Sequence, residues 1–217
     1  MKYLPMNDEL YAYLSRHRSD ADDCLLAELR AETEALGSES RMQISSEQGG
    51  LLAILVAVTG SKSIVEVGTF TGYSSLCMAR ALPADGRLLC LDQSEEWTFI
   101  ARKYWRKAGV AEKIELMIGP AVESLKRLED KPRFDFAFID ADKREYDAYY
   151  EGILPRMKRN SLIAFDNMLW GGSVLDSEAN DPDTAAIRAL NEKLRYDLRV
   201  ECVLLPVADG MQLCRVR

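Results

Sequence analysis

Between residues 63 and 165 the sequence alternates short apolar segments with amphipathic ones, and this alternation restricts the possible folds more than any other feature. It predicts strands at 63–67, 87–91, 113–118, 134–139 and 161–165, and helices at 73–82, 95–107, 121–128 and 146–158. Strands that alternate with helices form a parallel sheet that has helices on both faces. The strands are almost continuously apolar, as expected when both faces of a sheet are covered. The sequence therefore predicts an α/β fold.

The two ends of the chain depart from this alternation. Helices are predicted at 6–16, 20–36 and 46–59, with Ser45 or Ser46 as the N-cap of the third. After a helix at 184–196, strands at 200–206 and 211–216 flank a turn at 208–210, which predicts an antiparallel hairpin at the sheet edge. We expect one domain over 1–217, a mostly parallel seven-stranded sheet on which the helices of 1–60 pack. The irregular stretch 171–183 follows a strand end, where loops line active sites.

Charge and apolar content exclude several classes of protein. The net charge of −7 disfavours nucleic-acid binding, for which a basic surface is expected. No apolar run reaches the roughly 18–20 residues of a membrane span. The start, Met1–Pro5, is soon followed by Asp8 and Glu9 and lacks the apolar stretch of a secretory signal. We therefore expect a soluble, cytoplasmic enzyme.

Cysteine and histidine usage limits the possible chemistry. The five cysteines are widely spread and form no C-x-x-C pair, so zinc clusters and disulfide frameworks are not predicted. Cys77, Cys90 and Cys214 lie in apolar segments and are expected to be buried thiols. His17, the single histidine, lies in a polar segment without a catalytic motif around it. Carboxylates, lysine, a cofactor or a metal must therefore carry any chemistry.

The turn after the first strand of the alternating region has the pattern E-x-G-x-x-x-G, from Glu66 through Gly68 to Gly72. Glycines there let the backbone turn tightly and approach a ligand. The G-x-G-x-x-G spacing of a dinucleotide site is absent, which argues against an NAD-dependent oxidoreductase. Asp92 ends the next strand and could accept hydrogen bonds from ribose hydroxyls. A ligand with a ribose and no phosphate, such as S-adenosylmethionine, suits this combination, although a tight turn alone could explain the glycines.

Two later strands end in polar residues. Asp140 follows one, and Asp166 and Asn167 follow the next, so adjacent strands would bring three oxygen donors together. Oxygen donors suit Mg²⁺, Mn²⁺ or Ca²⁺. Lys143 lies about one helical turn after Asp140 and could accept a proton from a phenol whose pKa a cation has lowered. The alternative is that Asp166 and Asn167 only cap a turn and that Lys143 is a solvated surface residue.

These motifs together resemble the metal-dependent class I O-methyltransferases typified by catechol O-methyltransferase and plant caffeoyl-CoA O-methyltransferase. The resemblance covers about residues 40–217, including Met42–Ser45, Glu66–Ser74, Phe134–Lys143, Asp166–Trp170 and Leu205–Gly210. It implies a Rossmann-like methyltransferase fold, a homodimer, and a divalent cation held by Asp140, Asp166 and Asn167. It further implies Lys143 as the base and Met42 and Trp170 beside the substrate. The implied contacts to S-adenosylmethionine are Ile44, Glu66, Gly68, Thr69, Ser74, Asp92, Ala121 and Asp142.

The sequence departs from the plant caffeoyl-CoA pattern after Trp170. Gly171 replaces an asparagine that touches the substrate in the plant enzymes, and the following loop carries four acids: Asp176, Glu178, Asp181 and Asp183. Acids would repel the phosphates of coenzyme A, which favours a free catechol-like or phenylpropanoid acceptor, although Arg16 and Arg18 could supply charge.

Two further functions stay open at this point. One is methylation of a tRNA hydroxyuridine, for which the basic residues Arg102, Lys103, Arg106 and Lys107 could contact RNA. The other is a non-catalytic protein that only binds the cofactor, since a fold alone does not establish activity.

Overall fold

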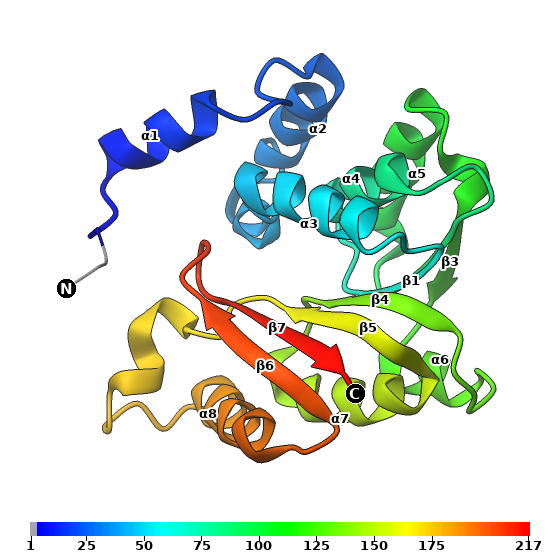
Figure 1. The fold of residues 1–217 in the computed structure, drawn as a ribbon. Coiled ribbons are helices and arrows are strands. Elements are labelled where there is room, and N and C mark those ends of the chain that lie inside the picture. Colours follow the sequence, from blue (N-terminus) through cyan, green and yellow to red (C-terminus); the bar gives the residue numbers. More distant parts are fainter. Residues whose placement is uncertain (1–3) are drawn as a thin grey trace.

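The computed structural model, which describes residues 4–217, is built on a seven-stranded sheet with the strand order β3-β2-β1-β4-β5-β7-β6 (Figure 1). β1 to β5 pair in parallel, whereas β7 pairs antiparallel with both β5 and β6. The strands are β1 (Ser63–Val67), β2 (Arg87–Asp92), β3 (Ile114–Ile118), β4 (Phe134–Ile139), β5 (Met157–Phe165), β6 (Val200–Leu205) and β7 (Met211–Val216). The predicted mixed sheet and its C-terminal hairpin are confirmed.

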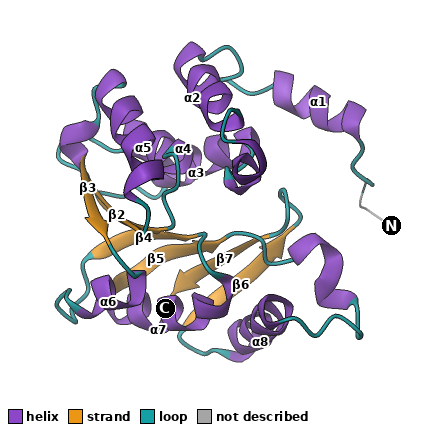
Figure 2. Cartoon of the chain, turned by 180° about the vertical axis from the view of Figure 1, so that it is seen from behind, coloured by secondary structure: helices purple, strands orange, loops and turns teal. Residues whose placement is uncertain are grey.

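Helices cover both faces of the sheet, as Figure 2 also shows from behind. One face carries α2 (Cys24–Glu34), α3 (Ser46–Val58), α4 (Tyr73–Ala81) and α5 (Glu95–Lys107), and the other carries α6 (Ala121–Lys126), α7 (Tyr146–Ile153) and α8 (Pro182–Tyr196). The first helix, α1 (Asp8–Arg16), extends away from these layers and has no buried residue. Within residues 4–217, no helix is long and apolar enough to cross a membrane. Residues 1–3, part of the segment used above to argue against a secretory signal, lie outside the described residues.

Each face of the sheet has its own apolar core, because side chains of a strand point alternately to opposite faces. In β1, Val65 and Val67 pack in the core under α6, α7 and α8, whereas Ile64 packs in the core under α2 to α5. The second core includes Leu29 of α2 and Leu52 of α3, which are fully buried. Two of the three N-terminal helices are therefore part of the main body of the domain.

The region around β5 differs from the prediction. The helix predicted at 146–158 ends at Ile153, and β5 begins at Met157 instead of 161. Pro155 lies in the short 3₁₀ turn Leu154–Arg156 between them, and proline lacks the N–H that a continuing helix needs. The early part of β5 pairs with β4 through a register shift between Phe134 and Phe136, which a simple strand pattern does not reveal.

Two helices also begin at other residues than predicted, because side chains cap their first turns. The helix predicted from residue 20 begins at Cys24, since the Asp23 carboxylate accepts a hydrogen bond from the backbone N–H of Leu26. The stretch 171–183 is less irregular than predicted, because Trp170–Leu175 contains short 3₁₀ turns on either side of a kink at Gly171 and Gly172. α8 then begins at Pro182 after the N-cap Asp181, earlier than the predicted start at 184.

Candidate active site

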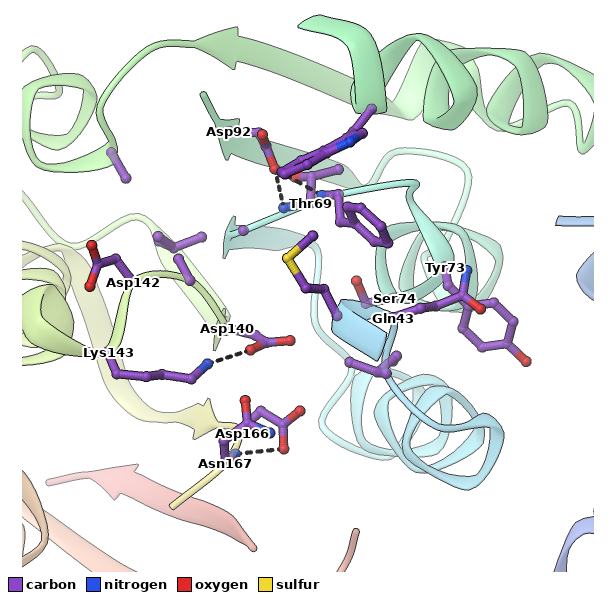
Figure 3. A pocket seen from close by; sticks show the side chains of 18 of the residues that line it. Gln43, Thr69, Tyr73, Ser74, Asp92, Asp140, Asp142, Lys143, Asp166 and Asn167 are labelled. Atoms are coloured by element: carbon purple, nitrogen blue, oxygen red, sulfur yellow. Dashed lines mark hydrogen bonds and ion pairs between the residues drawn. The ribbon is translucent and has the colours of Figure 1, made fainter. Parts of the chain in front are cut away.

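The carboxyl ends of the parallel strands open into a cavity of about 1060 Å³, shown in Figure 3. This is the sheet edge at which open α/β folds bind ligands. In Figure 3, Asp92 and Thr69 lie at one end of the pocket, and Asp140, Lys143, Asp166 and Asn167 gather at the other. Of the site residues predicted from the sequence, all except Glu66 line this cavity: Met42, Ile44, Gly68, Thr69, Ser74, Asp92, Ala121, Asp140, Asp142, Lys143, Asp166, Asn167 and Trp170.

The turn after β1 requires glycine at two positions. Gly68 has a φ of +87°, and a Cβ atom there would lie 1.8 Å from the backbone oxygen of Asp140. Gly72 has a φ of +86°, and its Cβ would lie 2.6 Å from Cβ of Ala101 in α5. The first glycine therefore lets the ends of β1 and β4 lie against each other at the cavity, and the second lets α4 and α5 pack closely.

Asp92 at the end of β2 holds this turn in place. Its Oδ2 accepts hydrogen bonds from the backbone N–H groups of Thr69 and Phe70, both at 2.8 Å, and its Oδ1 accepts one from Ser94 at 2.8 Å. Each carboxylate oxygen has two lone pairs, so acceptor capacity remains for hydroxyls of a ligand. The structure thus gives Asp92 an organising role that the sequence did not indicate.

An aromatic pair forms the wall beside Asp92. The rings of Phe70 and Trp97 meet edge to face with centroids 5.1 Å apart, and both residues line the cavity. Edge-to-face contact is favourable between aromatic rings, and it holds the two rings in fixed orientations. Trp97 was not among the predicted site residues, because a tryptophan in the first turn of α5 has no distinguishing pattern.

Glu66 lies behind the cavity wall and does not reach the cavity. Its fully buried carboxyl accepts hydrogen bonds from Ser74 Oγ at 2.6 Å and from Cys90 Sγ at 3.3 Å. Burial raises the pKa of the Glu66 carboxyl to about 7. A direct contact between Glu66 and the cofactor, which the family resemblance implied, does not follow from this position; Glu66 instead orients Ser74 from behind.

At the opposite end of the cavity, Lys143 is held by two partners. Its Nζ donates to Asp140 Oδ1 at 2.8 Å and to the phenolic oxygen of Tyr146 at 2.7 Å, and the side chain is about 10% exposed. Nζ also lies 5.8 Å from the ring centroid of Trp170. Lys143 is therefore not the solvated surface lysine of the alternative hypothesis, since it is nearly buried among site residues.

Asp166 is nearly buried and has two close hydrogen-bond donors. Its Oδ1 accepts from the backbone N–H of Asn167 and from Gln48 Nε2, both at 2.7 Å. Burial, and then the negative charge of Asp140, raise the pKa of the Asp166 carboxyl to about 7. Two carboxylates this close favour either a proton or a cation between them, as expected from the sequence.

The donor set at this end fits a hard cation. Asp140 and Asp166 offer carboxylate oxygens, and Asn167 beside them offers an amide oxygen in the same cavity. No group of three or more His, Cys, Asp or Glu within residues 4–217 is placed to hold a metal ion, so a cation here would depend on that amide. Asn167 has a φ of +58°, a conformation that asparagine tolerates better than most residues. This φ lets the chain turn directly after β5, and the side chains of Asp166 and Asn167 both line the cavity.

Two residues that the sequence did not single out support these side chains. Gln48 in the first turn of α3 uses Nε2 for Asp166 and uses Oε1 to accept from the backbone N–H and hydroxyl of Ser45, at 2.9 and 3.0 Å. Tyr146 accepts from Lys143 and donates to the backbone oxygen of Asp166 at 3.2 Å. The spacing S-x-x-Q indicates a capping box, but no local signal indicates the contact with Asp166.

Polar and flexible side chains surround the mouth of the cavity. Met42 is 42% exposed and lines the opening, as does Trp170. The backbone beside Trp170 is held by the β6–β7 turn, where Asp209 Oδ1 accepts from Gly171 N at 2.7 Å. Asp142 pairs with Arg144 at 2.5 Å, and this hydrogen bond lowers the pKa of the Asp142 carboxyl. The mouth therefore carries opposite charges that partly neutralise each other.

The basic face of α5 is partly neutralised by α2. Lys103 forms an ion pair with Glu32 at 2.5 Å, and Lys107 forms one with Glu28. These contacts reduce the positive charge that RNA binding would require. They favour a helix-packing role for these lysines over a role in binding tRNA.

Comparison with known proteins gives one consistent result. The O-methyltransferase family profile matches residues 16–217. The chain is 41% identical over 211 residues to probable caffeoyl-CoA O-methyltransferase 2 of Dictyostelium discoideum, with 95% of this chain and 91% of that protein covered.

Two solved structures extend this comparison. The O-methyltransferase from Bacillus cereus in complex with S-adenosylhomocysteine has a TM-score of 0.83 and 33% identity, covering 89% of this chain and 91% of that one. The O-methyltransferase TomG from Streptomyces achromogenes in complex with S-adenosylmethionine has a TM-score of 0.84 and 29% identity, covering 98% and 99%.

Proposed function

The chain belongs to the O-methyltransferase family, and we propose that it transfers the methyl group of S-adenosylmethionine to a hydroxyl oxygen of a small catechol-like or phenylpropanoid phenol, with a divalent cation at Asp140, Asp166 and Asn167. The observation that carries this proposal is that one cavity contains both halves of the required site. The glycine turn with Asp92 lies at one end, and the two carboxylates with Lys143 lie at the other.

The end near Asp92 suits the adenosyl part of the donor. Gly68 lines the cavity beside Asp92, and Asp92 keeps acceptor capacity for ribose hydroxyls. Phe70 and Trp97 offer an apolar wall to the adenine ring. When bound, S-adenosylmethionine supplies an electrophilic methyl group on a positively charged sulfur.

The opposite end suits deprotonation of a phenol, whose ordinary pKa near 10 makes it a poor nucleophile at neutral pH. A divalent cation, when bound, would lower the pKa of a phenolic hydroxyl beside it. Lys143 would release Asp140 Oδ1 to the cation and stay held by Tyr146. After one Nζ proton has passed to solvent, the neutral amine would be positioned to accept the phenolic proton. Gln48 and the backbone of Asn167 would keep Asp166 in its present orientation.

The acidic loop after Trp170 supports a small acceptor rather than a coenzyme A thioester. Asp183 lies at the cavity mouth and is 3.7 Å from Arg144, so Arg144 is already engaged by Asp142 and Asp183. Phosphates of coenzyme A near Asp183 would be repelled by its charge, and Arg41, which lines the same cavity, is the cation that could oppose this repulsion. Because relatives are named as caffeoyl-CoA O-methyltransferases, caffeoyl-CoA is the acceptor against which small phenols should be compared in the same assay.

The experiment is a mass-spectrometric assay of methyl transfer from S-adenosylmethionine to catechols, caffeate, caffeoyl-CoA and tRNA, each with Mg²⁺ and with EDTA. We expect one added methyl on a catechol, lost with EDTA. Transfer that persists in EDTA would contradict the cation, transfer to caffeoyl-CoA alone would contradict the small acceptor, and transfer to tRNA would support the RNA alternative.

We further propose that the protein is a homodimer that uses α1. This helix has no buried residue, and Tyr13 and Leu14 on it are exposed, which supports a role in association. Sedimentation equilibrium of the full chain and of a Tyr13→Ser, Leu14→Ser variant tests this. A wild-type monomer at micromolar concentration would contradict it.

A further inference from the structure

Two cysteines face each other across the C-terminal hairpin, and neither is among the residues assigned to methyl transfer. Cys202 of β6 and Cys214 of β7 are direct partners in the antiparallel register, and their sulfur atoms are 2.8 Å apart. Residues directly opposite in an antiparallel pair have Cα atoms about 4.5 or 5.5 Å apart. Both values fall within the roughly 4.4–6.8 Å that a disulfide requires, so the backbone needs no rearrangement to accommodate the bond.

The surroundings of this pair allow an oxidant to reach one of the two thiols. Cys214 is fully buried, whereas Cys202 is half-buried and lines a second cavity of about 640 Å³ formed by β6, α8 and the segment between them. The hydrogen bond between the two thiols lowers the pKa of the Cys202 thiol, and the same contact, together with burial, raises the pKa of the Cys214 thiol. The thiolate, which is the nucleophilic form, is therefore favoured at Cys202. Cys202 is therefore both the more accessible and the more reactive of the two cysteines. Cys214 lies directly opposite it and can act as the resolving thiol, which completes the disulfide.

We propose that Cys202 and Cys214 are a redox-active pair that forms a reversible intrachain disulfide with a low-molecular-weight disulfide such as glutathione disulfide as the oxidant. The Cys202 thiolate attacks one sulfur of glutathione disulfide and displaces one glutathione as its thiolate. The Cys214 thiol then attacks Cys202 Sγ of the mixed disulfide and displaces the second glutathione, whose sulfur takes the proton that Cys214 loses. Two protein thiols are oxidised and one glutathione disulfide is reduced to two glutathiones.

The cross-link would lie in the element that supports the cavity mouth. The hairpin turn beyond the pair contributes Ala208 and Asp209 to the cavity lining, and Gly210 O accepts a hydrogen bond from Met168 N at 2.9 Å. Joining β6 to β7 therefore fixes the two strands that carry this turn. The proposal does not depend on the proposed function, because it concerns residues outside the candidate active site.

The experiment uses the full chain, reduced, desalted and equilibrated with glutathione disulfide, then acid-quenched, denatured and alkylated with N-ethylmaleimide. Intact mass should show three of the five cysteines alkylated and the loss of two hydrogen atoms, and peptide mapping should join Cys202 to Cys214. The thermal unfolding midpoint should rise on oxidation and return on reduction with dithiothreitol, since the cross-link restricts the unfolded chain.

Two variants complete the test. Cys202→Ser should leave all four remaining thiols free to react, whereas Cys24→Ser, which changes an exposed cysteine elsewhere, should still form the bond. Five alkylated thiols in the oxidised wild-type protein, a stable glutathione adduct at Cys202, or a disulfide mapped to any other pair would overturn the proposal. Because mapping on the wild-type chain is decisive alone, a folding defect in a variant does not affect the conclusion.

Discussion

Gln48 and Asp166 are 118 residues apart in the chain, yet the Gln48 amide donates a 2.7 Å hydrogen bond to Asp166 Oδ1 inside the protein. The same side chain caps α3 by accepting from Ser45. Gln48 therefore connects the segment that contains Met42 and Ile44, at the cavity mouth, to a proposed cation ligand.

Replacing Gln48 by leucine should weaken cation binding about 10- to 100-fold, the usual cost of losing a group that orients a ligand. Binding of Mn²⁺ followed by electron paramagnetic resonance measures this without turnover. Ser45→Ala is the matched control, because it removes the hydroxyl bond to Gln48 Oε1 but leaves the backbone bond from Ser45 N and the Gln48–Asp166 bond in place, and it should leave Mn²⁺ affinity close to that of the wild type. Equal losses in the two variants would show that Gln48 acts only on the helix start.

Asp140→Ala should abolish nearly all turnover and the dependence on a divalent cation. It removes one of two proposed carboxylate ligands and also the ion-pair partner of Lys143. Affinity for S-adenosylmethionine, measured by calorimetry, should change little, because Asp92 and the glycine turn are at the other end of the cavity. Asp147→Asn, at an exposed acid of α7, is the control. Cation-stimulated turnover retained in Asp140→Ala would contradict the ligand assignment.

Lys143→Met should lower turnover about 100- to 10,000-fold, the range ascribed to general acid–base catalysis, while cofactor affinity stays near the wild-type value. Single-turnover methyl transfer at saturating donor separates this chemical effect from binding. If S-adenosylmethionine binding collapses in the variant, Lys143 has a structural role instead.

Tyr146→Phe should lower turnover about 10-fold, because it removes one hydrogen bond to Lys143 worth roughly 1–1.5 kcal/mol. Tyr150→Phe is a matched control in the same helix: Tyr150 donates to Asp197 at 2.8 Å and does not line the active-site cavity. Its turnover should equal that of the wild type. Comparable losses of turnover in both variants would indicate general damage to α7.

Glu66 should make folding stability depend on pH. Its pKa is about 7 in the folded chain and 4.5 ordinarily, so between these values the unfolded chain loses a proton that the folded chain keeps. Stability from this residue therefore falls as pH rises from about 4.5 to about 7, by on the order of 3 kcal/mol. Urea unfolding of the wild type and of Glu66→Gln across this range should show the difference. Parallel stability curves would contradict it.

Much of the fold and the site could be predicted because the signals are local. Gly68, Asp92, Asp140 and Asp166 each follow a recognisable strand, and parallel strands bring their ends to one edge. The contacts of Gln48 and Tyr146 could not be predicted, because they depend on how α3 and α7 pack around Asp166. The position of Glu66 behind the wall, in contrast, follows from a local feature, because the alternation of side chains along β1 turns Glu66 away from the cavity.

The strand order has a consequence for the order in which the sheet can assemble. β6 is made before β7, but it joins the sheet only through β7, which lies between it and β5. Until β7 joins the sheet, β5 therefore has an open edge on that side and β6 has no strand on either side, and open edges are prone to pair with other chains. During that interval the half-exposed Val203 and Leu204 of β6 have no strand beside them, so this segment is the part of the hairpin most open to pairing with another chain.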